Sequence, residues 1–366
     1  MQQMLAFLRT RRAAAACLAL MVLAGAWTHY FVVPQENRAG NDIYFDFQEA
    51  QRIIAGENPY ERILSGDMRT NQKYATYFPL FYLLSAGAIK LGFQEFPQWL
   101  ALWRIIFLGF NAGAGVILFY LLWPKRGLLL AVFGVLFWFF SRWNLRITTS
   151  ANIDYPAVFF LLLSFWLLPR HRVGSFLVLG LSLGFKQVDS ILIPLFLIAV
   201  WQSEKQQRIR ALLGVSVALA STLVVTSAVF LAANPESFLK SMVFEAVRDP
   251  ASHIDAASLG VMLGWSSAAS RLPFFALIAL VYALFWRRKI GFYTAGLLAL
   301  ASFINFNPVL FLQYFVWLTP FFPLAASEAF FGGGTSCDAT AGDRIESTAP
   351  GGEGSGRRET ETVASG

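Results

Sequence analysis

Long apolar segments follow one another along almost the whole chain, and a water-soluble core could not bury them all. They lie at about 13–33, 98–123, 127–143, 155–169, 173–185, 189–202, 210–232, 271–286, 290–306 and 310–330. A helix needs about 20 apolar residues to cross the hydrocarbon of a bilayer. Only 14% of the residues are charged and 56% are hydrophobic, whereas a soluble domain carries about 25% charge. We therefore predict an all-α polytopic membrane protein with about ten transmembrane helices.

Basic residues gather in short clusters between the apolar segments. Cytoplasmic loops of membrane proteins carry an excess of Lys and Arg, so this pattern accounts for the net charge of +7 without a nucleic-acid-binding stripe. The first apolar segment lacks a small-residue cleavage site and is predicted to be an uncleaved anchor. Both termini are then expected in the cytoplasm. The clusters are Arg9, Arg11 and Arg12; Lys125 and Arg126; Arg170 and Arg172; Lys205, Arg208 and Arg210; and Arg287, Arg288 and Lys289.

The apolar segment at 77–92 is not predicted to cross the membrane. If it did, Lys125 and Arg126 would lie on the outer side. The segment has only about 16 residues, short for a span, and it contains Pro79 and Lys90. We expect it to form a helix in the outer interface.

The chain is expected to form one membrane domain, residues 1–331. A first outer loop is predicted at 34–97 and a second large outer loop at 234–270. Residues 332–366 are rich in Gly, Ser, Thr and Glu and are expected to form a disordered cytoplasmic tail. The two cysteines lie far apart in the sequence and the three histidines lack ligand spacing, so neither a disulfide framework nor a metal site is predicted.

The first outer loop carries two carboxylates with helical spacing. Asp42 and Asp46 share a face if both lie on a helix, and residues 45–55 have the spacing of a helix that Gly56 would end. Asp42 is expected to precede this helix as its cap. An acidic residue at a helix start is favoured by the helix dipole without any chemistry, and the spacing alone favours that structural interpretation.

Four motifs along the chain resemble those of a known enzyme class. With them the chain resembles membrane glycosyltransferases of the GT-C class, and most nearly glycosyltransferase family 87, the bacterial polyprenyl-phosphate-mannose-dependent α-mannosyltransferases. The resemblance covers about residues 13–326. The motifs are Asp42 … Ala50 … Gly56-x-x-Pro59-Tyr60; Tyr77-x-Pro79-Leu80-x-x-x-Leu84; Gly180-x-x-x-Gly184-Phe185-Lys186; and Phe311-Leu312-Gln313-Tyr314-Phe315-Val316-Trp317-x-x-Pro320.

The resemblance implies a GT-C-like helix bundle with interfacial helices in the first outer loop. It also implies an inverting transfer of a hexose, mannose in the family, from a polyprenyl-phosphate donor to an acceptor hydroxyl. The acceptor would be a lipid or a glycan, on the outer face of a bacterial inner membrane. Many relatives have two prolines where this chain has Phe78-Pro79, and some have a close Asp-x-Asp pair where it has Asp42 and Asp46. These departures leave the sugar and the acceptor open.

By the same resemblance, Asp42 is the general base that accepts the proton of the acceptor hydroxyl. Cations should stabilise the polyprenyl phosphate that leaves. Four fall at predicted outer ends of spans: Lys186, Arg104, Arg142 and Arg146. Asp46 is a candidate substrate-binding residue. Lys186 could instead be a snorkelling structural lysine, and Arg142 and Arg146 could be interface anchors.

Three further residues are candidates for binding the substrate. Asp154, which follows Asn152 at the outer start of a predicted span, could recognise a sugar hydroxyl or simply cap its helix. Gln313 and Tyr314 lie at the outer start of the last span. They could either pack in the membrane interface or line a cavity.

The rival function is a multi-pass transporter or lipid flippase. Such a protein should carry charges near the middle of the membrane in broken, internally repeated helices, whereas polar residues here gather at the outer ends of the spans. We therefore expect a hexosyltransferase whose partners are a polyprenyl-phosphate sugar, an acceptor and membrane lipids. No nucleic acid and no cofactor are expected, and no divalent metal is required.

Overall fold

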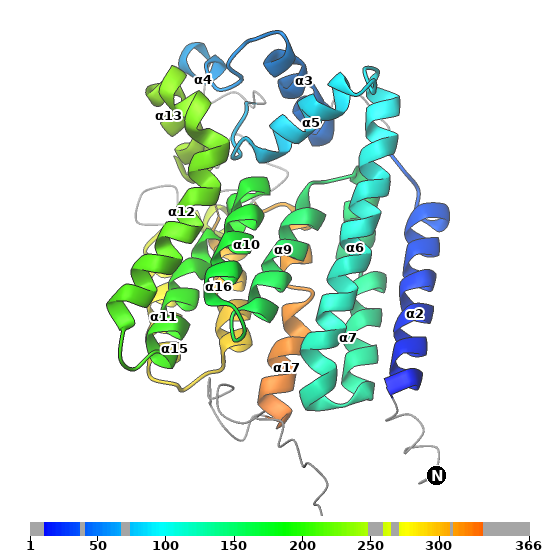
Figure 1. The fold of residues 1–366 in the computed structure, drawn as a ribbon, viewed down its shortest axis with the longest axis vertical. Coiled ribbons are helices and arrows are strands. Elements are labelled where there is room, and N and C mark those ends of the chain that lie inside the picture. Colours follow the sequence, from blue (N-terminus) through cyan, green and yellow to red (C-terminus); the bar gives the residue numbers. More distant parts are fainter. Residues whose placement is uncertain are drawn as a thin grey trace, which may run out of the picture.

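The computed structural model describes residues 11–36, 41–66, 74–247, 259–264, 271–307 and 310–331, and these residues form helices without any β-strand. Figure 1 shows a bundle of helices capped at its upper end by shorter ones. The elements are α2 (Arg11–Trp27), η1 (Thr28–Val32), α3 (Asp42–Ile54), α4 (Arg62–Ser65), α5 (Leu80–Lys90), α6 (Phe96–Arg126), α7 (Leu128–Phe140), α8 (Arg142–Ser150), α9 (Asp154–Leu167), α10 (Arg172–Phe185), η2 (Gln187–Leu192), α11 (Ile193–Ser203), α12 (Arg208–Ala233), α13 (Pro235–Val247), α14 (Leu259–Met262), α15 (Leu272–Trp286), α16 (Phe292–Phe306), η6 (Leu312–Trp317) and α17 (Phe321–Phe331).

Four helical stretches of the described chain are long and apolar enough to cross a membrane: Arg11–Val32, Phe96–Pro124, Leu128–Ser150 and Arg208–Ala233. These four stretches give the chain the character of a helical membrane protein. The other predicted spans coincide with shorter helices, so the count of about ten crossings stays a prediction. The predicted tail and much of the second large outer loop lie outside the described residues.

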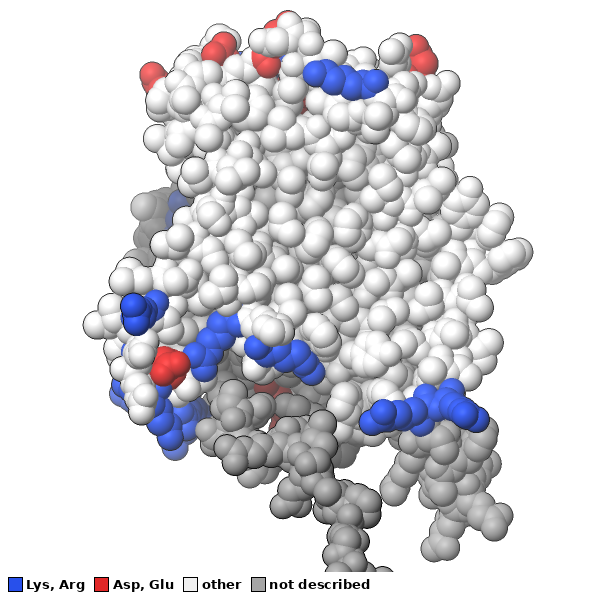
Figure 2. All heavy atoms as spheres, viewed as in Figure 1, with Lys and Arg blue, Asp and Glu red and all other residues white. Residues whose placement is uncertain are grey.

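The exposed charged side chains are unevenly distributed over the surface of the molecule. On the face in Figure 2, Lys and Arg gather mainly at the lower end and Asp and Glu mainly at the upper end, with a broad uncharged band between them. The apolar helix α12 exposes three of its valines: Val217, Val225 and Val229 expose 66%, 78% and 74% of their surface. An uncharged band with exposed aliphatic side chains matches the hydrocarbon region of a bilayer.

The cap is built from α3, α4 and α5, with α13 beside them (Figure 1). α3 packs along α5, and the predicted segment 77–92 is present as this helix, which lies across the upper end of the bundle. Gly184, in the last turn of α10, has no Cβ, and a Cβ there would come within 2.9 Å of Leu80 in α5. The glycine therefore allows α5 to seat directly on the end of α10.

α9 and α10 are antiparallel neighbours joined by a short turn. The Ser175 and Ser182 hydroxyls of α10 donate to the carbonyls of Ser164 and Ala157 in α9, each at 2.7 Å. Hydroxyl-to-carbonyl bonds of this kind hold helices together where no water competes. Because the helices run in opposite directions, the start of α9 and the end of α10 meet at the same end of the bundle, just below the cap.

Candidate functional site

A buried ion pair joins these two helix ends. Lys186 follows the last residue of α10 in an extended conformation, and only 3% of its surface is exposed. Its Nζ lies 2.8 Å from Oδ1 and 3.0 Å from Oδ2 of Asp154, the first residue of α9, which is fully buried. The cap position of α9 is occupied by Ile153 rather than by Asp154. Of the two interpretations left open for Asp154, the contacts therefore favour a role in a polar site over capping.

Aromatic side chains from two further segments enclose this pair. The indole Nε1 of Trp317 in η6 donates to Asp154 Oδ1 at 2.6 Å. The Lys186 ammonium lies 5.7 Å from the ring centre of Tyr77 and 5.6 Å from that of Tyr314, within the range of cation–π attraction. The structure thus brings Lys186, Asp154 and Tyr314 together from distant parts of the sequence. We call Lys186, Asp154, Trp317, Tyr77 and Tyr314 the Lys186 site.

A pair of amides lies beside the Lys186 site. The Nδ2 of Asn152 donates to Oε1 of Gln313 at 2.9 Å. Ala151, in the left-handed conformation with φ 54°, ends α8. Asn152 follows it in the short link to α9, which begins at Asp154. Gln313 therefore has a polar partner among the residues next to the site. Amides, a carboxylate and aromatic rings are also the groups that hydrogen-bond to and stack on a sugar.

The ion pair limits how the Lys186 site could bind a phosphate. An ammonium has three donors, and the two carboxylate oxygens of Asp154 accept from it. A phosphate that reaches Lys186 must share it with Asp154, since the pair as a whole is neutral. The aromatic rings exclude water, which would strengthen the electrostatic contact between a phosphate and Lys186.

Asp42 and Asp46 lie one helical turn apart on α3, above this site in the cap. Asp42 is the first residue of the helix rather than its cap: the extended residue Asn41 occupies that position, and the helix starts three residues before the predicted 45–55. Asp42 is exposed and Asp46 is buried, with 8% of its surface accessible. Burial raises the pKa of Tyr82 in α5 well above its usual value, and Asp46 adds to this effect. Asp46 therefore faces inward toward α5.

Glu49 is a buried carboxylate that sequence reasoning missed. It lies one turn beyond Asp46, is 2% exposed, and pairs with Arg62 at 2.6 Å and with Arg52 at 3.4 Å. Burial raises the pKa of Glu49, and the two arginines oppose this shift. The signal was present in the sequence, because Glu49 falls between buried residues Asp46 and Ala50 on the inner face of α3.

The three arginines considered for phosphate binding contact groups other than the Lys186–Asp154 pair. Arg104 donates to the carbonyls of Thr148 and Thr149 at the end of α8 and to the carbonyl of Glu36, which ties the chain after η1 to α8. Arg146 is exposed and lies 3.7 Å from Glu36. The Arg142 guanidinium lies over the Trp143 ring, and that ring stacks on Phe315 of η6. Among the three, Arg142 is thus the one tied by contacts to an element of the Lys186 site.

The described residues contain no cluster of three or more His, Cys, Asp or Glu side chains suited to hold a metal ion. Comparison of the chain with protein-family models, curated proteins and solved structures finds no match. The fold and the site therefore define a helical protein with membrane character and a buried, aromatic-lined polar site, and its activity is a matter for proposal.

Proposed function

We propose that this protein is a membrane glycosyltransferase that transfers a hexose, mannose by the resemblance to family 87, from a polyprenyl-phosphate donor to an acceptor hydroxyl. The observation that carries the proposal is the Lys186 site. It places a buried ammonium with amide and aromatic neighbours at one end of an apolar bundle, directly below a cap that bears carboxylates. A lipid-linked sugar needs such a combination, because its chain is apolar, its phosphate is anionic and its sugar is polar.

In the proposed reaction the acceptor oxygen attacks the anomeric carbon of the donor and inverts it. Asp42 accepts the hydroxyl proton as general base. The bond from the anomeric carbon to the phosphate oxygen breaks, and polyprenyl phosphate leaves with the electron pair. Lys186 stabilises the charge that develops on this leaving group, while Asn152 and Gln313 orient the sugar. Asp46, buried one turn from Asp42, is the other carboxylate of α3 that could serve as the base.

The proposal includes a topology of about ten spans with both termini in the cytoplasm, in the inner membrane of a bacterium. Supporting it, basic side chains gather at the end of the molecule opposite the cap (Figure 2). α5 would then lie in the outer interface, and the reaction would take place on the outer face of the membrane.

The test is an assay of the purified full-length protein in liposomes, with radiolabelled polyprenyl-phosphate mannose and an extract of cell-envelope lipids and glycans as acceptor. Asp42→Asn should abolish label transfer but leave donor binding unchanged, whereas Lys186→Met should weaken donor binding. Glu95→Gln changes another exposed carboxylate, in the link between α5 and α6, and serves as the matched control. Full transfer by Asp42→Asn with loss in Asp46→Asn would reassign the base to Asp46. Unchanged transfer in both would refute the mechanism.

The alternative of a transporter or lipid flippase has one observation in its favour. Asp189 in η2, three residues beyond Lys186, is a fully buried carboxylate, and an ionisable group inside a helix bundle often marks a transport pathway. The same liposomes separate the two functions. A flippase would move the intact donor to the opposite leaflet without releasing the sugar from its lipid.

A further inference from the structure

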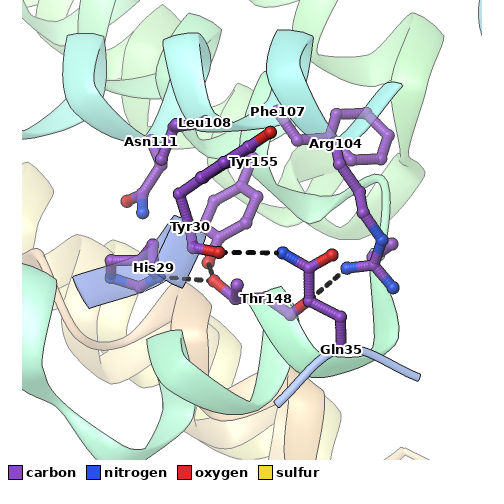
Figure 3. Close-up of a pocket in the computed structure, with 10 residues that line it drawn as sticks. His29, Tyr30, Gln35, Arg104, Phe107, Leu108, Asn111, Thr148 and Tyr155 are labelled. Carbon is purple, nitrogen blue, oxygen red and sulfur yellow. Dashed lines mark hydrogen bonds between the residues drawn. The ribbon is translucent and has the colours of Figure 1, made fainter. Parts of the chain in front are cut away.

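Asp189 in η2 is a fully buried carboxyl group, and neither of its side-chain oxygens has a hydrogen-bond partner among the described residues. Several polar side chains of the pocket in Figure 3 show the usual arrangement, in which buried groups bond to one another or to backbone carbonyls. There His29 donates to the Phe139 carbonyl and contacts the Thr148 hydroxyl. Arg104 donates to the Thr148 carbonyl. An ionised carboxylate needs such partners more than a neutral group does, so their absence points to an uncharged Asp189.

The helices packed around η2 bring no positive charge to Asp189. η2 lies against α10, α11 and α16. The one charged side chain of these three helices is Arg172, in the first turn of α10 and so at the end of that helix opposite to η2, where it pairs with Glu204 at 2.8 Å. Their other titratable side chain is Tyr293, in the first turn of α16. An ionised Asp189 would therefore lack a counter-charge from its neighbours.

Two further helices reach η2 without approaching Asp189 with a charge. The Tyr282 hydroxyl of α15 donates to a backbone carbonyl of η2. Met242 of α13 contacts the Gln187 amide, while Lys240 of the same helix is partly exposed. Neither helix thus supplies a partner to the buried carboxyl group.

Lys186 is the nearest positive charge along the chain, three residues before Asp189, and it is already paired. Its ammonium donates to both carboxylate oxygens of Asp154. The pair is neutral as a whole, so it does not compensate a second carboxylate. A proton on Asp189 removes the need for compensation, because a neutral acid avoids the cost of a buried charge.

A serine beside Asp189 points to the same protonation state. The Ser182 hydroxyl of α10 lies next to the carboxyl group, but it donates its single proton to the Ala157 carbonyl at 2.7 Å. With that proton committed, the hydroxyl oxygen can only accept. A hydrogen bond between Ser182 and Asp189 therefore requires the proton to come from the carboxyl group.

The backbone around Asp189 forms a break between two helices. Lys186 is extended, and η2 continues the chain as a 3₁₀-helix before α11 begins. Broken helices and buried ionisable groups are typical of ion and proton sites in membrane proteins, and short 3₁₀ stretches often act as hinges. Gln187 ties this break to the cap, because its Nε2 donates to the Thr76 carbonyl at 2.9 Å. Loss of the proton would leave a bare carboxylate inside the break.

From these observations we infer that Asp189 is a proton-binding site, occupied at neutral pH, and that release of its proton destabilises the break beside the Lys186 site. The carboxyl O–H bond breaks and the proton passes to water, so no other reactant is needed. A proton requires only one neighbouring acceptor such as Ser182, whereas Mg²⁺ and Ca²⁺ require several oxygen ligands. The inference is independent of the proposed sugar transfer, which does not use Asp189.

The first test is infrared difference spectroscopy of the purified full-length protein in detergent at neutral pH. The wild type should show the C=O stretching band of a protonated carboxylic acid, and Asp189→Asn should lose it. Glu95→Gln removes an exposed carboxylate and is the matched control, which should keep the band. Asp189→Ala, which is also neutral, takes the place of Asp189→Asn if that variant does not fold. If the variant loses a carboxylate band instead, Asp189 is ionised and the inference is wrong.

The second test is the pH dependence of stability, measured by reversible unfolding in detergent micelles. An Asp in the unfolded chain loses its proton at about pH 3.9, whereas the folded protein keeps the proton on Asp189. The folding equilibrium constant of the wild type, relative to Asp189→Asn, should therefore fall about tenfold per pH unit above that value until Asp189 also titrates in the folded protein. A ratio that stays constant from about pH 5 to 7 would overturn the inference.

A monovalent cation is the other occupant that a buried carboxylate can hold. The infrared measurement is repeated at one fixed pH, with sodium chloride in place of choline chloride. An acid band that sodium leaves unchanged supports the proton site. Loss of the acid band in sodium would make the ligand a metal cation and would overturn the inference.

Discussion

Lys186 and Asp154, 32 residues apart in the sequence, form a buried ion pair that joins the end of α10 to the start of α9. The same Asp154 oxygen accepts the Trp317 indole proton, so η6 is tied to the pair as well. The Asp154 carboxylate thus links three elements below the cap. Its removal should lower the stability of the protein and also alter the Lys186 site.

The first prediction concerns the energetic coupling of this pair. Breaking a buried ion pair from one side leaves an uncompensated charge and costs about 3–5 kcal/mol. Lys186→Met and Asp154→Leu should each lower the free energy of unfolding by an amount of this order, and the double variant by clearly less than the sum. Reversible unfolding in detergent micelles measures this coupling. Strictly additive losses would mean that the two charges do not interact in the folded protein.

The second prediction concerns the contact between Gln313 and Asn152. Gln313→Leu leaves the Asn152 amide without its acceptor, and a lost hydrogen bond of a buried group costs about 1–3 kcal/mol. If the amide pair also orients the sugar, Gln313→Leu should weaken donor binding about tenfold, while Gln313→Glu, which keeps an acceptor oxygen, should retain more of it. Titration of the liposome-bound protein with labelled donor measures the Kd. If both variants bind the donor with the Kd of the wild type, Gln313 has no role in donor binding.

The third prediction concerns the pH dependence contributed by Glu49. Burial raises the pKa of Glu49 in the folded protein, so the folded state holds this proton to a higher pH than the unfolded state does. The contribution of Glu49 to stability is then fully present below the unfolded pKa of about 4.3 and is lost as the pH rises through the folded pKa. Relative to Glu49→Gln, the wild type should therefore become less stable as the pH rises through this window.

The measurement is the difference in Tm between wild type and Glu49→Gln across that pH range. Arg62→Gln sharpens the test. Because Arg62 opposes the shift of the Glu49 pKa, its removal should extend the pH-dependent loss to higher pH. If the wild type instead becomes more stable relative to Glu49→Gln as the pH rises, the arginines, rather than burial, determine the direction of the Glu49 pKa shift.

The fourth prediction concerns Glu328, which caps a helix from a distant element. The carboxylate of Glu328 in α17 accepts from the backbone N–H groups of Tyr293 and Thr294 at the start of α16, at 3.0 and 2.8 Å. An anion at a helix N-terminus satisfies orphan donors and complements the helix dipole. Glu328→Ala should lower the free energy of unfolding by about 1–2 kcal/mol.

Gly291 offers an independent route to the same effect. A Cβ at this position would overlap the Glu328 carboxylate, so Gly291→Ala should displace that carboxylate from the helix start. Thermal unfolding of both single variants and of the double variant tests the idea. Because both changes break one contact, the double variant should lose little more than Glu328→Ala alone, and full additivity would contradict the capping role.

The sequence alone located the helices well. Apolar length and periodicity are local properties, so the predicted segments 77–92 and 271–286 correspond closely to α5 and α15. The start of α3 was misplaced, because Asn41 rather than Asp42 occupies the cap position. Helix ends depend on which of several neighbouring polar residues takes that position, and spacing does not distinguish between them.

The sequence by itself determined an all-helical chain with membrane character and placed Lys186 at the end of a glycine-containing helix. Only the tertiary structure decided which groups Lys186 contacts. Its carboxylate comes from Asp154 and its aromatic neighbours from Tyr77 and Tyr314, while Arg104 is tied to backbone carbonyls. Periodicity tells which face of a helix is buried but not which helix lies against it. That choice rests on close packing between distant segments, such as Gly184 against α5, and it determines the partners of every buried polar group.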